Sequence, residues 1–242
     1  MSVVHLVGGG RDDQLLAPIF ERFVADAATA ASADRPRVHA LLVLEGGEDA
    51  ADDRFCSALH RAGADLVVHA IVEGETFTPA AIDGAAALAV GGGLTPAYAA
   101  AVAPIAVLIR ERVEAGAPYL GFSAGAAIAA EHALVGGYLL DGVEVCDAAA
   151  GEELGELTMS DGLGLVPFTV DVHAAQWGTV SRLVAAVQAG LALDGFAIDE
   201  HTAVVQRQWG EPEIGGAGAA WYVGGGGFTV ADLTVRRLLP PA

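Results

Sequence analysis

The chain has 242 residues, of which 53% are hydrophobic, so it is long enough and apolar enough to form one substantial α/β domain. Its 31 acidic residues outnumber its 12 basic ones, all of them arginines, and the formal net charge is -19. A surface of this sign repels phosphate backbones and anionic lipids, which excludes nucleic acid and membrane surfaces as favoured partners. Solubility explains the acidic excess more simply than steering of a cationic substrate does.

The cysteines and the N-terminal segment indicate a cytoplasmic protein. Cys56 and Cys146 are the only cysteines, too few for a disulfide framework in a chain of this length. Residues 1–7 carry no basic region, and their apolar run is too short for a signal peptide. No stretch approaches 18 uninterrupted apolar residues, so no membrane span is predicted.

In the first half of the chain, short apolar runs alternate with longer segments of helical periodicity. The pattern predicts strands at 3–7, 38–44, 64–71, 85–90 and 118–122, and helices at 15–31, 52–62 and 95–115. Unbroken apolar strands that alternate with helices indicate a parallel sheet covered on both faces. The predicted fold class is therefore α/β, with a doubly wound, mainly parallel sheet.

The second half is less regular. It predicts helices at 124–132 and 180–189, strands at 134–140, 168–172, 196–198 and 202–206, an exposed loop at 146–162 and an edge strand at 229–238. No linker interrupts the pattern. We therefore expect residues 1–242 to form a single domain.

The strongest chemical signal is Gly121-Phe122-Ser123-Ala124-Gly125, which lies between a predicted strand and a predicted helix. This is the G-x-S-x-G nucleophile elbow in the context that it requires. A serine at the tip of such a turn presents its hydroxyl above the sheet, and small flanking residues let the turn close. The simpler alternative is an ordinary tight strand-to-helix turn.

A second loop should lie beside the elbow. Gly91-Gly92-Gly93 ends the preceding predicted strand, and ligands bind at the carboxyl ends of parallel strands. The backbone amides of Gly92 and Ala124 could then form an oxyanion hole. A flexible turn or a phosphate-binding loop are the alternatives.

A nucleophilic serine needs a base, and the chain has seven histidines. His173 and His201 are the candidates, because the other five fall inside predicted strands or on predicted helices. His173 is favoured since it ends a strand, and His201, in an acidic turn, remains its rival.

The acidic residue that orients the imidazole is not fixed by the sequence. Asp141 ends the strand that follows the elbow helix. Its competitors are Glu131, Glu144, Asp171, Asp199 and Glu200.

Taken together, the motifs resemble peptidase family S51, the cyanophycinase and aspartyl dipeptidase group with a class I glutamine amidotransferase-like fold. The matching segments follow one another in the family's order and span nearly the whole chain: Val7-Gly8-Gly9-Gly10, Val90-Gly91-Gly92-Gly93, Gly121-Phe122-Ser123-Ala124-Gly125-Ala126, Asp161-Gly162-Leu163-Gly164-Leu165, Asp171-Val172-His173 and Ile198-Asp199-Glu200-His201-Thr202-Ala203. The resemblance implies a flavodoxin-like three-layer sandwich that needs no metal or organic cofactor.

The resemblance also implies roles for single residues. Ser123 would be the nucleophile, His173 the base and Asp141 the acid, with oxyanion donors near Gly92 and Ala124. A serine stands where amidotransferases of this fold use a cysteine, so hydrolysis is implied rather than ammonia transfer.

Two segments depart from the family's pattern. Leu94-Thr95 follow the glycine triplet in place of an acidic or amide residue and a glutamine, and Trp177 and Thr179 stand where arginines would be expected. Cyanophycin is therefore a doubtful substrate, and a small peptide or an aspartyl dipeptide is a better one. Arg182 could pair with a substrate carboxylate and Trp177 could line the pocket, whereas a solvated helix face and simple packing are the alternatives.

Three functions follow in order of preference. The first is a serine peptidase for small peptides. The second is a non-catalytic or divergent binding protein on the same fold, and the third is an esterase-type serine hydrolase, which would promote His201. Homodimers are the common assembly for such domains, although no sequence feature demands one.

Overall fold

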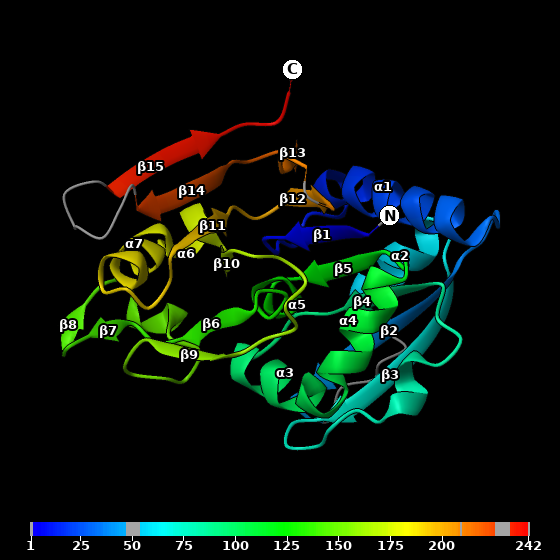
Figure 1. The fold of residues 1–242 in the computed structure, drawn as a ribbon, viewed down its shortest axis with the longest axis horizontal. Coiled ribbons are helices and arrows are strands. Elements are labelled where there is room, and N and C mark those ends of the chain that lie inside the picture. The colour runs from blue at the N-terminus through cyan, green and yellow to red at the C-terminus, as the bar shows by residue number, and fades with distance from the viewer. Residues whose placement is uncertain (1, 47–53, 209, 226–232, 242) are drawn as a thin grey trace.

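The computed structural model describes residues 2–46, 54–208, 210–225 and 233–241. Its main sheet has seven strands in the order β13-β12-β1-β5-β4-β2-β3 (Figure 1). The strands are β1 (Val3–Val7), β2 (Arg37–Leu44), β3 (Asp65–Val72), β4 (Ala87–Val90), β5 (Tyr119–Phe122), β12 (Thr202–Arg207) and β13 (Glu213–Gly216). The strands from β1 to β5 are mutually parallel, and β12 and β13 are antiparallel to their neighbours. The prediction of a mainly parallel sheet is confirmed.

Helices cover both faces of this sheet. Alternate residues of β1 enter different cores: Val4 and Leu6 pack in one, Val3 and Val7 in the other. The core of Val3 and Val7 includes α1 (Asp13–Ala31) and α2 (Arg54–Arg61), whereas the core of Val4 and Leu6 includes α3 (Thr95–Val102) and α4 (Ala106–Glu114). The fold is thus a three-layer α/β sandwich (Figure 1).

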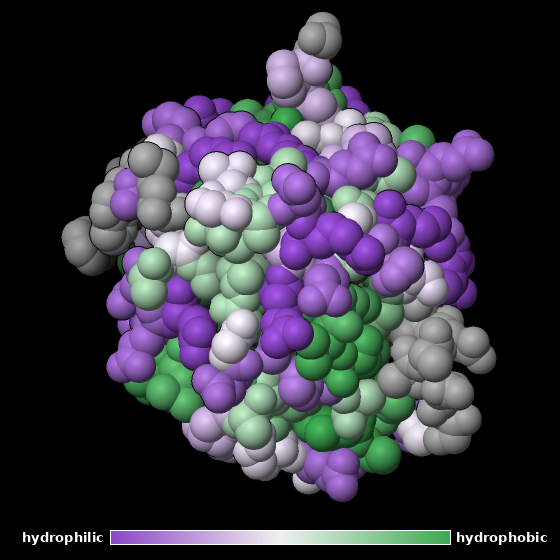
Figure 2. Space-filling model, turned by 90° about the vertical axis from the view of Figure 1, so that its right-hand side faces the viewer, coloured by the Kyte–Doolittle hydropathy of each residue, from purple (hydrophilic) through white to green (hydrophobic). Residues whose placement is uncertain are grey.

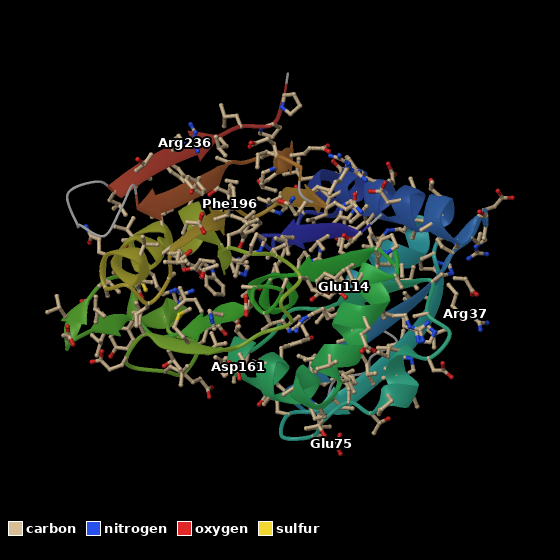
Figure 3. The ribbon with its side chains drawn as sticks, viewed as in Figure 1. Arg37, Glu75, Glu114, Asp161, Phe196 and Arg236 are labelled. Carbon is tan, nitrogen blue, oxygen red and sulfur yellow. The ribbon has the colours of Figure 1, made fainter. Side chains whose placement is uncertain are left out.

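A second sheet was not distinguished in the sequence. It consists of β10 (Thr169–Val172), β11 (Asp194–Ile198), β14 (Ala220–Gly225) and β15 (Leu233–Leu238), in that order. The helix α7 (Val180–Gln188) packs against β11 and β14. Figure 3 shows Phe196 in the interior of this region and Arg236 on the outer strand β15. Phe196 contacts the rings of Phe168 and Tyr222, and the Arg236 guanidinium lies 5.0 Å from the centre of the Tyr222 ring.

The predicted helix at 124–132 is wrong in its extent. The helix α5 (Ala124–Ala127) has four residues, and the chain then enters β6 (His132–Gly136), which pairs with β9 (Thr158–Asp161). The carbonyl groups of Ile128, Ala129 and Ala130 accept hydrogen bonds from the amides of residues 163, 165 and 164, so they are not used for further helical turns. The predicted loop at 146–162 accordingly contains η4 (Ala148–Ala150) and β9.

Two other predictions need adjustment, and two extend beyond the described residues. The helix predicted at 95–115 is interrupted by η3 (Ala103–Ile105), which contains Pro104, because proline cannot donate the helical hydrogen bond. The strand predicted at 134–140 divides into β6 and the short β7 (Leu139–Leu140), which pairs with β8 (Val143–Glu144). The starts of the helix predicted at 52–62 and of the strand predicted at 229–238 lie outside the described residues.

The surface is mixed in character. Figure 2 looks onto the side that lies at the right in Figure 1 and shows hydrophilic residues interrupted by patches of hydrophobic ones. The edge strand β3 lies on that side and carries the exposed side chains of Val68 and Val72. None of the helices among the described residues has both the length and the hydropathy that crossing a bilayer requires.

Candidate active site

Ser123 lies on a sharp bend between β5 and α5. Its backbone angles, φ 53° and ψ -112°, are unlike those of either a helix or a strand, and such a conformation costs on the order of 1–3 kcal/mol. The bend needs glycine on both sides. A Cβ atom at position 121 would lie 2.2 Å from the Gly125 carbonyl oxygen, and one at position 125 would lie 2.3 Å from the Val90 carbonyl oxygen. The strand–turn–helix context that the sequence predicts is confirmed.

The structure brings Ser123 and His173 together. The Ser123 Oγ atom lies 2.8 Å from the Nε2 atom of His173. His173 follows β10 with a left-handed φ of 54°, and its amide donates to the Gly8 carbonyl oxygen at 3.0 Å. The glycine turn at the end of β1 therefore holds the backbone of the histidine.

Glu200, and not Asp141, is the acid beside the imidazole. The Nδ1 atom of His173 lies 2.8 Å from Glu200 Oε1. The parallel strands β10 and β11 pair Val172 with Ile198, so the residues that follow the two strands meet. Asp141 is exposed in the turn between β7 and β8, and it makes no hydrogen bond to His173. The choice of Asp141 from the sequence is thus wrong.

The remaining acidic candidates have other surroundings. Glu131 and Glu144 are exposed. Asp199 is buried and accepts hydrogen bonds from the amides of Ala175 and Ala219 and from the indole of Trp221. It therefore joins α6 (Ala174–Trp177) to β14 and stabilises the loop that carries Glu200. The described part of the chain holds no group of three or more His, Cys, Asp or Glu side chains suited to a metal ion.

Burial and the neighbouring side chains determine the pKa of His173. Desolvation lowers the pKa of the imidazole from its ordinary value, and the hydrogen bond that the imidazole donates to Glu200 opposes that shift only in part. Trp177 contributes to the burial, because its indole stacks on the imidazole with ring centres 3.9 Å apart and planes 12° apart. The indole remains 41% exposed, so it lies at the rim of the site. A neutral imidazole is suited to accept the Ser123 proton.

The segment 91–94, which we call the glycine loop, lies against the serine. A Cβ atom at Gly92 would lie 2.9 Å from the Cβ atom of Ser123. The amides of Ser123 and Gly125 donate to carbonyl oxygens of Val7 and Gly91, whereas no described residue accepts from the amides of Gly92 and Ala124. Two unused donors beside a nucleophile are what an oxyanion hole requires.

His201, the rival base, is used elsewhere. Its Nε2 atom accepts hydrogen bonds from the backbone amides of Arg11 and Asp12 at 3.1 and 3.0 Å. The lone pair of that nitrogen is thus occupied at the start of α1, and the histidine makes no hydrogen bond to Ser123.

Arg182 is buried, and its guanidinium is used within the protein. It is 3% exposed and makes a two-pronged ion pair with Asp171, at 2.9 and 2.6 Å. Its remaining Nη1 group donates to the carbonyl oxygens of Gly137 and Ala150. The prediction that Arg182 binds a substrate carboxylate is wrong, and so is its alternative of a solvated helix face. A periodicity argument cannot detect an arginine that joins two segments distant in the sequence.

Comparison with known proteins identifies the family. The model of peptidase family S51 matches residues 53–209, well over half of the chain. The chain belongs to peptidase family S51. Membership supports a hydrolase of the peptidase type and confirms the resemblance of the motifs.

Curated relatives include the cyanophycinases of Trichormus variabilis and Nostoc sp.. Each is 34% identical to this chain over 124 residues, which cover 50% of this chain and 38% of the relative. The match thus spans less than half the length of these relatives.

Two solved structures share the fold. A peptidase from an acI-B1 Actinobacterium superposes with a TM-score of 0.64 and 18% identity, covering 100% of this chain and 96% of its own. A putative peptidase E protein from Listeria monocytogenes superposes with a TM-score of 0.56 and 18% identity. This match covers 90% of this chain and 99% of the other. The predicted fold class is confirmed by these peptidases.

Proposed function

We propose that this protein is a serine peptidase that hydrolyses peptide or isopeptide bonds of small peptides through an acyl-enzyme on Ser123. The observation that carries the proposal is the continuous relay from Ser123 Oγ to His173 Nε2 and from His173 Nδ1 to Glu200 Oε1, with 2.8 Å at each step. A nucleophile, a base and an orienting carboxylate in this order are the arrangement of serine hydrolases.

The acylation step uses all three side chains. Ser123 transfers its hydroxyl proton to His173 Nε2 while its Oγ atom attacks the carbonyl carbon of the scissile bond. The electron pair of the carbonyl moves to its oxygen, which the amides of Gly92 and Ala124 stabilise. His173 then donates its proton to the departing amine, and the carbonyl forms again as an ester of Ser123.

Water completes the cycle. His173 takes a proton from a water molecule, whose oxygen attacks the ester, and the proton returns to Ser123 as the acid product leaves. Glu200 keeps the Nδ1–H tautomer in place and stabilises the imidazolium in both halves of the reaction. Burial favours this role because it keeps His173 neutral between the steps.

Trp177 is our candidate for a residue that contacts the substrate. It stacks on the imidazole that protonates the leaving amine, and it is partly exposed. We therefore place it beside the leaving-group residue, where an indole face favours an apolar, aromatic or cationic side chain. Recognition of a substrate carboxylate has to come from groups other than Arg182.

The test is a library of dipeptides and isopeptides, with aspartyl peptides and cyanophycin included because two relatives are cyanophycinases. The wild-type protein should cleave at least one small peptide, and Ser123→Ala should abolish that cleavage. Asp141→Asn serves as the matched control and should retain the wild-type rate. Cleavage by Ser123→Ala at the wild-type rate would refute the mechanism. A chain that cleaves nothing but short acyl esters, or binds peptides without turnover, would support the esterase or the binding protein instead.

A further inference from the structure

An acidic side chain that the mechanism does not use reaches Thr95, the residue that follows the glycine loop. The Oε2 atom of Glu152 accepts a hydrogen bond from the backbone amide of Thr95 at 2.9 Å. Glu152 and its neighbour Glu153 both have left-handed backbones, with φ of 56° and 61°. Such conformations are uncommon for glutamate and cost roughly 1 kcal/mol or more each, so the surrounding structure must hold them in place.

The helix α3 depends on this contact for its N-terminal cap. Thr95 is the first residue of α3, and Leu94 at the N-cap position supplies no side-chain hydrogen bond. The first amides of a helix lack partners within the helix, and a carboxylate that accepts from one of them also interacts favourably with the helix dipole. Glu152 provides this carboxylate from a segment 57 residues away in the sequence.

The same contact fixes the end of the glycine loop that is farther from the sheet. At the other end, the Gly91 amide donates to the Leu41 carbonyl oxygen at 3.1 Å. In the middle, the Tyr98 hydroxyl, itself on α3, donates to the Gly92 carbonyl oxygen at 3.3 Å. Gly92 is therefore held between the sheet and the start of α3. A shift of α3 would move the Gly92 amide away from Ser123.

The segment that carries Glu152 is itself anchored in the interior. Arg182, paired with Asp171, donates to the carbonyl oxygens of Ala150 and Gly137. The Gly137 amide donates to the Gly151 carbonyl oxygen at 2.8 Å. Glu152 follows directly in the sequence, so a buried ion pair sets the position of its backbone.

We propose that Glu152 is a positioning residue: it caps α3 and thereby holds the Gly92 amide at the distance from Ser123 that an oxyanion donor needs. This inference rests on the proposed function, in which Gly92 stabilises the oxyanion. The carboxylate acts through the Thr95 amide and has no contact with the reacting atoms. Glutamine at this position keeps an oxygen acceptor, whereas alanine removes it.

Glu152→Ala, Glu152→Gln and the neighbouring Glu153→Ala test the proposal on the full chain. Glu153 matches in charge and in left-handed backbone but is exposed. With a peptide that the wild type cleaves, Glu152→Ala should lower kcat about tenfold with KM changed less than twofold, since a displaced oxyanion donor weakens transition-state binding only. Glu152→Gln should retain most of the wild-type kcat, and Glu153→Ala all of it.

Hydrogen exchange gives a readout that is independent of activity. The peptide segment containing residues 91–98 should exchange faster in Glu152→Ala than in Glu153→Ala and wild type, because the Thr95 amide loses its acceptor. Unchanged exchange would overturn the capping role even if the enzyme is inactive on every substrate. A raised KM with unchanged kcat would overturn the positioning role, because Glu152 would then contact the substrate. Altered exchange in a chain without peptidase activity would refute the proposed function and leave the capping intact.

Discussion

His173 and His201 have similar backbone conformations and similar surroundings, but only His173 can act as a base towards Ser123. Both residues have left-handed backbones, with φ of 54° and 57°, and both rings pack against the glycine turn after β1. A Cβ atom at Gly9 would lie 2.2 Å from the ring of His173, and one at Gly10 would lie 2.5 Å from the ring of His201. The N-terminal glycines are therefore needed for the two imidazoles to approach the backbone.

The difference lies in the Nε2 atom. In His173 it faces the Ser123 hydroxyl, whereas in His201 it accepts from the backbone amides of Arg11 and Asp12, which directly precede α1. Protonation of His201 Nε2 would break both of those bonds, so this ring serves the structure. A histidine near the carboxyl ends of the strands is thus a candidate base only if its acceptor nitrogen is free.

The largest expected effect separates the two histidines. His173→Ala should lower kcat/KM on the order of 10⁴-fold, because it removes the base from the proposed relay. His201→Ala should lower kcat/KM less than tenfold but reduce the melting temperature, since the two amides directly before α1 lose their acceptor. Steady-state kinetics and thermal unfolding of both variants give the comparison. A larger kinetic loss in His201→Ala would reverse the assignment.

The next largest effect is expected for Glu200, the carboxylate beside His173. Glu200→Gln should reduce kcat/KM by about 10³-fold, since an amide cannot stabilise the imidazolium and can favour the wrong tautomer. Asp141→Asn removes the same charge from the exposed turn and should change kcat/KM less than twofold. Equal losses in the two variants, measured with the same peptide, would show that net charge and not the relay is responsible.

Stability should depend on the ion pair of Arg182. Arg182→Met leaves the Asp171 carboxylate buried without its partner and should lower the free energy of unfolding by about 3 kcal/mol. The double variant with Asp171→Leu should recover part of this loss, because no unpaired charge remains. Urea denaturation measures both. If the single variant were as stable as the wild type, the buried pair would not anchor the loop of Glu152.

The smallest expected effect is a shift in the pH dependence of kcat/KM. Burial lowers the pKa of His173, and the base is active when it is neutral. As the pH is lowered, kcat/KM should therefore still be high at pH 6.5, roughly the ordinary pKa of histidine. It should fall only when the pH drops through the lower pKa of the folded state. Trp177→Ala exposes the imidazole and should move this fall upward by less than about one pH unit. His201→Ala should leave the profile in place. A fall that moves to lower pH in Trp177→Ala would mean that the indole does not desolvate the base.

Much of this arrangement was predictable from local patterns. The strands from β1 to β5, the elbow at Ser123 and the histidine that ends β10 each carry a signal within a few residues: an apolar run, paired glycines or a strand end. The Ser123–His173 pairing also followed from the family motifs, whose order along the chain is specific.

The rest depends on contacts between distant segments. Glu200 reaches His173 only because β10 and β11 are parallel neighbours in a second sheet that the sequence did not separate from the first. Glu152 caps a helix from 57 residues away, and Arg182 joins α7 to the loop before Glu152. From the sequence alone, charged residues on a helix or in a loop are expected to be solvent-exposed. Burial by a distant segment does not change the periodicity of the sequence, so it cannot be predicted from that pattern.

The central claim is that His173 activates Ser123, and labelling with a fluorophosphonate tests it without any knowledge of the substrate. Mass spectrometry of digested protein should locate the adduct on the peptide that contains Ser123, formed at equal rates in wild type and His201→Ala and far more slowly in His173→Ala. No adduct at Ser123, or labelling of His173→Ala at the wild-type rate, would contradict the account.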